Sequence, residues 1–133
     1  METGSTITSV RYCIGLFSAI PVATADCATG HVAAFVYDST ADGTVFWRAV
    51  TRDNATSNIQ ATSQAIAAST AYWMRIRCDS TDCRFWINGG APLITTSTNL
   101  PGSTTYLSMY ETVTNLANSA RVIAVGNHTI RTR

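Results

Sequence analysis

Residues 72–90 read YWMRIRCDSTDCRFWINGG, and this stretch predicts two β-strands joined by a tight turn. Apolar side chains occupy every second position of both arms: Tyr72, Met74, Ile76, Cys78, then Cys83, Phe85, Ile87. A period of two indicates a strand whose one face is buried. The run 79–82 supplies turn chemistry, because short polar side chains hydrogen-bond the nearby backbone. Asn88-Gly89 supplies the positive φ angles of a second tight turn.

The rest of the chain continues in the same pattern of strands and polar turns. Further strands are expected at 8–18, 31–38, 44–51, 93–96, 106–112 and 121–130. Segment 57–68 is ambiguous: its isoleucine spacing fits one helical face, but its Ser and Thr content argues equally for a strand and a loop. Strands and turns at such even spacing predict an all-β, antiparallel β-sandwich or jelly roll with almost no helix.

Bulk composition limits the class of protein. The 133 residues suffice for one domain, 1–133, in which 1–7 is expected to form a flexible or partner-binding arm. The chain is 46% hydrophobic and 13% charged, which argues against disorder. A net charge of +1 gives no electrostatic footprint for nucleic acid. No apolar run approaches the ~20 residues that span a bilayer, so no membrane contact is expected, and no secretory signal is visible.

The run from Trp73 to Arg77, the turn, and the run from Cys83 to Gly89 together resemble the concanavalin A-like (laminin G-like) jelly-roll superfamily. The preceding hairpin, from Phe35 through Gly43 to Trp47, fits the same pattern. The resemblance covers roughly 8–131 and is greatest to small jelly-roll proteins of tailed-bacteriophage particles. It implies a capsid decoration or tail-fibre protein in the virion, an extracellular particle. The major capsid protein or another virion protein would be its partner, and it would form a homo-oligomer.

Catalytic constellations are missing from the sequence. Retaining glycoside hydrolysis needs two carboxylates about 5 Å apart, but the only glutamates are Glu2 and Glu111, and every aspartate falls in a loop or turn. No Gly-x-Ser-x-Gly motif occurs, and His31 and His128 are isolated in predicted strands. We therefore expect no enzyme activity and no cofactor.

Metal binding has one weak candidate. Asp38 and Asp42 frame the run DSTADG at 38–43, where oxygen ligands crowd a turn that ends in Gly, as in a calcium loop. The third carboxylate of an EF-hand loop is absent. The alternative, which we favour, is that these aspartates only cap the turn, so no metal is expected.

The four cysteines form the best local chemistry. Cys78 and Cys83 flank a four-residue turn and should face each other across the hairpin, near enough for a disulfide. Cys13 and Cys27 could then pair and tie the first strand to the loop that follows it. Four cysteines allow three connectivities, and four buried thiols are the alternative.

Aromatic and cationic side chains share the second face of the hairpin, opposite the expected core residues. This set contains Trp73, Trp86, Arg75, Arg77 and Arg84. Three interpretations stay open: the face stacks sugars, it buries against a neighbouring subunit, or the other sheet of the sandwich covers it.

The leading hypothesis from the sequence is a non-enzymatic virion structural protein, a capsid decoration or cement protein that stabilises the shell through subunit contacts. The alternative is a carbohydrate-binding, lectin-like module of a tail fibre or surface protein.

Overall fold

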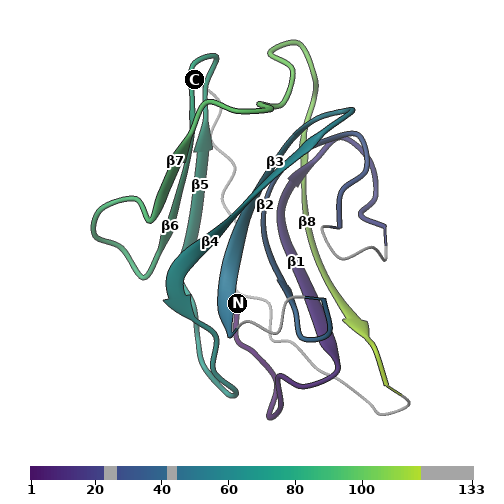
Figure 1. The fold of residues 1–133 in the computed structure, drawn as a ribbon, viewed down its shortest axis with the longest axis vertical. Coiled ribbons are helices and arrows are strands. Elements are labelled where there is room, and N and C mark those ends of the chain that lie inside the picture. Colours follow the sequence, from purple (N-terminus) through teal and green to yellow (C-terminus); the bar gives the residue numbers. More distant parts are fainter. Residues whose placement is uncertain (23–26, 42–44, 118–133) are drawn as a thin grey trace.

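The computed structural model describes residues 1–22, 27–41 and 45–117, and the regular secondary structure in this part of the chain is β-sheet. Figure 1 shows the strands in two sheets. The strands are β1 (Val10–Phe17), β2 (His31–Asp38), β3 (Phe46–Asp53), β4 (Ser57–Ala65), β5 (Met74–Cys78), β6 (Cys83–Ile87), β7 (Ile94–Thr96) and β8 (Ser108–Asn115). The predicted all-β class and antiparallel pairing are therefore confirmed.

The large sheet contains five strands in the order β4-β3-β2-β1-β8, and the small sheet contains three in the order β5-β6-β7. Strands β1 to β4 are sequential antiparallel neighbours. Strand β8 returns along the free side of β1 and closes the order of the large sheet. The finer topology of a concanavalin A-like jelly roll stays a prediction.

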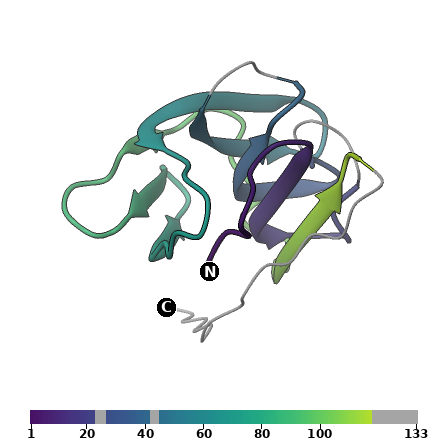
Figure 2. The same ribbon diagram turned by 90° about the horizontal axis from the view of Figure 1, so that it is seen from below.

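The two sheets lie beside each other (Figures 1 and 2), and one hydrophobic core is formed by side chains of both. Phe35 of β2 meets Phe85 of β6 edge to face, with ring centroids 5.4 Å apart. Trp47 of β3 is fully buried and contacts the rings of Tyr12 and Tyr72. Aromatic pairs of this kind add stabilisation beyond the area they bury. The side of the β5–β6 hairpin predicted to face the core does so.

A second buried cluster covers the opposite face of the large sheet. Its members are Cys13, Phe17, Cys27, Val32, Ala34, Val36 and Val50. Because β1 and β2 contribute alternate residues to both clusters, their side chains are buried on both faces. A strand buried on both faces reads as a continuous apolar run, as VAAFVY in β2 does.

The N-terminal residues, for which a flexible or partner-binding arm was expected at 1–7, are hydrogen-bonded to the segment before β5. Thr3 N–H donates to the Thr70 carbonyl at 3.1 Å, and Tyr72 N–H donates to the Met1 carbonyl at 2.8 Å. The Thr3 side chain is buried, and its hydroxyl donates to the Ala67 carbonyl at 2.6 Å. These bonds join residues far apart in the sequence, so local patterns did not reveal them.

The ambiguous segment 57–68 is strand β4 over Ser57–Ala65, so the helical interpretation was wrong. Pairing with β3 decides this, since Ile59 lies opposite Val50 and Ala61 opposite Arg48. The strand expected at 121–130 lies outside the described residues.

Candidate functional site

The small sheet presents one face to the core and one face away from it. Met74 pairs with Ile87 and Ile76 pairs with Phe85, and all four contribute to the core between the sheets. Side chains of a strand alternate between faces. The opposite side, here called the outer face, therefore carries Trp73, Arg75, Arg77, Arg84 and Trp86. The larger sheet covers the core side, so the interpretation in which it covers the Trp/Arg side was wrong.

Trp73 is strongly exposed on the outer face. The residue is 83% exposed, although its backbone is hydrogen-bonded. Trp73 N–H donates to Asn88 Oδ1 at 3.1 Å, and Asn88 N–H donates to the Trp73 carbonyl at 2.8 Å. The Trp73 backbone is thus held directly before β5, while its large apolar ring is in water.

Trp86 differs from the exposed platform that the sequence suggested, because it is only 8% exposed. Arg75 lies directly opposite it on β5, and the guanidinium carbon of Arg75 is 3.8 Å from the centroid of the indole. This is a cation–π contact, in which the positive guanidinium lies over the electron-rich ring face. Trp86 therefore serves as a base for Arg75.

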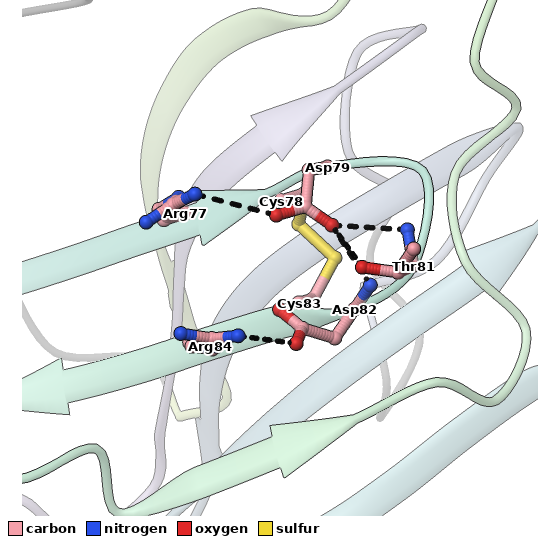
Figure 3. A network of polar contacts seen from close by, with 7 residues as sticks. All are labelled: Arg77, Cys78, Asp79, Thr81, Asp82, Cys83 and Arg84. Carbon is pink, nitrogen blue, oxygen red and sulfur yellow. Dashed lines mark hydrogen bonds and ion pairs between the residues drawn. A yellow bond between two sulfur atoms is a disulfide. The ribbon is translucent and has the colours of Figure 1, made fainter.

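Arg77 and Arg84 lie opposite each other across the hairpin, so their positive charges repel each other. Two aspartates of the turn compensate for it (Figure 3). Asp79 is 3.4 Å from Arg77, and Asp82 is 2.6 Å from Arg84. The hydrogen bond and charge of Asp82 raise the pKa of Arg84. Both arginines thus have a carboxylate partner within their own hairpin.

The turn between β5 and β6 is held by Asp79. Its Oδ1 accepts hydrogen bonds from the Thr81 hydroxyl at 2.7 Å, from Thr81 N–H at 2.9 Å and from Asp82 N–H at 3.1 Å (Figure 3). These bonds, that of the Thr81 hydroxyl first, lower the pKa of Asp79 because they favour the ionised carboxylate. The Cys78–Cys83 disulfide closes the same turn, with Cα atoms 4.0 Å apart.

The second disulfide joins Cys13 of β1 to Cys27, with Cα atoms 6.2 Å apart. Both residues are buried in the cluster on the far side of the large sheet. The pairing is the one favoured from hairpin geometry, so both predicted bridges are present.

Asp38, one of the two candidate calcium ligands, is fully buried at the end of β2. Its Oδ1 accepts from Thr40 N–H and hydroxyl, each at 2.8 Å, and its Oδ2 is paired with Arg11. Burial acts to raise the pKa of Asp38, but the hydrogen bonds from Thr40, Arg11 and Ala41 outweigh it, and the pKa is lowered. Both oxygens thus accept from protein donors. Asp42 lies outside the described residues.

The remaining chemical groups are dispersed. Within residues 1–22, 27–41 and 45–117, no group of three or more His, Cys, Asp or Glu side chains gathers as a metal site would require. Glu2 bridges to Ala71, whereas Glu111 lies on β8 opposite Ile14. His31 accepts a hydrogen bond from Gly102 N–H at its Nδ1, 3.0 Å away, and so holds the loop before β8. His128 lies beyond the described part of the chain.

Sequence reasoning missed one feature, the edge of the large sheet. Strand β4 pairs with β3 alone among the described strands, and no charged residue occurs from 54 to 74. Ile59, near the middle of β4, is 43% exposed. The charge-free run was visible in the sequence, but its place at a sheet edge was not.

A scan against protein-family models, a search of curated proteins and a search of solved structures each found no match to this chain. No helix in the described residues is long and apolar enough to cross a membrane. The function must accordingly be argued from the residues themselves.

Proposed function

We propose that this chain is a non-enzymatic structural protein of a virus particle, a concanavalin A-like jelly roll that decorates the capsid shell as a homo-oligomer. The observation that carries the proposal is the neutral edge strand β4. An edge strand offers unpaired N–H and C=O groups to other chains, and proteins that stay monomeric protect such edges with charges, prolines or bulges.

Strand β4 is only partly protected against pairing with another chain. Its pairing with β3 is regular from Ser57 to Ala61, and a register shift then interrupts it between the partners of Phe46 and Arg48. This irregularity interrupts the regular pairing toward the far end of β4. Residues 58–61 lack both charge and proline, so this segment is the part of the edge suited to subunit contact.

Such a contact would stabilise a shell by mass action. A subunit that binds the assembled shell, and not its separated parts, lowers the free energy of the assembled state. Two disulfides suit a particle that persists outside the reducing interior of a cell.

The test has two parts. Sedimentation-velocity measurements on the full chain should show a discrete oligomer at micromolar concentration. Electron microscopy with immunogold labelling, on particulate material from the cells that produce the chain, should place the label on regular particles. A monomer at every concentration, without labelled particles, would contradict the proposal.

A matched pair of variants assigns the contact to β4. Ile59→Lys places a charge at the neutral edge and should shift the oligomer toward monomer. Ile20→Lys is the control, since Ile20 is 71% exposed in the loop after β1 and lies away from β4. Equal dissociation by both variants would show that the effect is not specific to the edge.

Exposed Trp73 supports a second candidate function, a carbohydrate-binding module. The C–H face of a sugar ring packs on an aromatic ring and removes apolar area from water on both sides. The Trp73 backbone is held by hydrogen bonds to Asn88, so the indole is presented to solvent from a defined point directly before β5.

A further inference from the structure

Arg75 differs from the other two arginines of the outer face in its partners. Arg77 has Asp79 and Arg84 has Asp82, whereas no carboxylate in the described part of the chain forms an ion pair with Arg75. The side chain of Arg75 is exposed and rests on the ring of Trp86. The outer face therefore contains one ordered cation whose charge is not compensated.

Stacking prepares this guanidinium to bind an anion. A guanidinium is planar and presents its N–H donors in its own plane, in a fork that matches a carboxylate. When one flat side lies against an indole, the N–H edges stay free and the side chain loses less rotational freedom on binding. The direction of the donors is thus set before a ligand arrives.

Trp73 lies directly before β5 and two residues before Arg75, so the alternation of side chains places both on the outer face. Two residues of a β-strand span about 7 Å, which is comparable to the width of one sugar ring. A pyranose packed on the Trp73 indole could therefore direct a ring substituent toward Arg75. The two side chains together provide an apolar platform and a cationic fork at fixed spacing.

We propose that Trp73 and Arg75 form a binding site for acidic glycans, in which Trp73 packs against the sugar ring and Arg75 pairs with the carboxylate of a uronate or sialate residue. This inference rests on the carbohydrate-binding function proposed above. Nucleic acid is disfavoured as the occupant because Asp79 and Asp82 compensate the neighbouring arginines. Among the described residues of the outer face, Arg75 alone stays without a carboxylate, whereas nucleic-acid binding uses basic stripes.

The test is an array of oligosaccharides that contain galacturonate, glucuronate or sialate, each printed beside its methyl ester. The ester keeps the sugar ring and removes the charge. We expect the full chain to bind at least one acid at least tenfold more tightly than its ester. A polyglutamate peptide, which carries carboxylates without a sugar ring, should bind at least tenfold more weakly than that acid.

Variants assign the two roles. Trp73→Ala should abolish binding of the acid and the ester alike. Arg75→Gln should weaken binding of the acid about tenfold and leave the ester unchanged. Arg77→Gln is the matched control, because Arg77 lies on the same strand face but is paired with Asp79, and it should change binding less than threefold. Arg75→Lys keeps the charge without the planar fork, so it should also weaken acid binding. Thermal unfolding of each variant shows that it is folded.

The possible results distinguish the specificity for acidic glycans from the carbohydrate-binding function on which it rests. Equal binding of acids and esters, lost in Trp73→Ala, would overturn the acidic specificity but keep the glycan-binding function. Binding of neither acids nor esters would overturn both. Polyglutamate bound as tightly as the sugars would overturn the glycan assignment in favour of an acidic protein partner.

Discussion

Strands β2 and β5 differ in their exposure to solvent, although both belong to antiparallel sheets. Every residue of β2 after His31 is buried, and its side chains enter two separate hydrophobic clusters. In β5, by contrast, half-buried residues alternate with exposed ones. A strand buried on both faces can contribute packing and little else. A strand with an open face can present Trp73 and Arg75 to a ligand. The buried strands of the large sheet therefore supply packing, and the open face of the small sheet is the part that we propose binds a glycan.

The largest expected effect is the loss of a buried charge at the end of β2. Asp38→Asn leaves Arg11 buried without its carboxylate, and breaking a buried pair in this way costs about 3–5 kcal/mol. Denaturant unfolding followed by tryptophan fluorescence measures this cost. Asp53→Asn, at the exposed end of β3, keeps an amide oxygen to accept from Ala55 N–H and Thr56 N–H, so it should stay within about 0.5 kcal/mol of the unchanged chain.

The pH dependence of unfolding supplies an independent check on Asp38. Because its folded pKa is lowered, the carboxylate contributes stability above its unfolded pKa of about 3.9 and loses that contribution as the pH falls toward the folded pKa. The unchanged chain should therefore lose stability below about pH 4, and Asp38→Asn should lose less. An identical acid response of the two proteins would contradict the role assigned to this carboxylate.

The loss of the disulfide in the large sheet should destabilise the fold more than the loss of the disulfide in the small sheet. Cys13 and Cys27 are 14 residues apart, so opening that bridge with paired alanines should cost about 3 kcal/mol. Cys78 and Cys83 are only 5 apart, and their loss should cost about 2 kcal/mol and leave the domain folded. Intact mass after alkylation of denatured, unreduced protein comes first, because four alkylated cysteines would show that neither bridge forms.

Substitution of Gly15 and of Gly89 by alanine should have different costs, because Gly15 lies in the packed interior and Gly89 in an open turn. A Cβ at Gly15 would lie 2.4 Å from the Ala33 carbonyl oxygen of the adjacent strand, so Gly15→Ala must separate β1 from β2 at a cost of about 2 kcal/mol. Gly89 has nothing within 4 Å, but its φ of +82° is left-handed, so Gly89→Ala should cost about 1 kcal/mol. Thermal unfolding ranks the two, and the reverse order would show that the left-handed backbone at Gly89 costs more than the close approach of β1 and β2 at Gly15.

The smallest effect is expected at Trp73. Its indole is exposed, so Trp73→Ala should change the free energy of unfolding by less than about 0.5 kcal/mol. Phe85→Ala, on the core side of the same hairpin, should cost about 3–5 kcal/mol. A large loss of stability in Trp73→Ala would show that the indole packs within the fold and is not reserved for a ligand.

The sequence by itself determined what depends on neighbours along the chain. Alternation in 72–78 and 83–87 predicted the hairpin and its buried side, because the two faces of a strand follow directly from its period of two. The same register brought Cys78 opposite Cys83, so that bridge was predictable as well.

Only the tertiary structure decided what depends on contacts between distant segments. Trp86 and Trp73 occupy equivalent places in the alternating pattern of the sequence. In the structure, Arg75 stacks on Trp86, which is buried, whereas Trp73 is exposed to water. The segment from Ser57 becomes a strand because β3 pairs with it, and the N-terminal residues dock because Thr70 and Tyr72 lie beside them. In each case the free energy comes from a partner that local periodicity does not specify, since tertiary packing overrides weak intrinsic propensity.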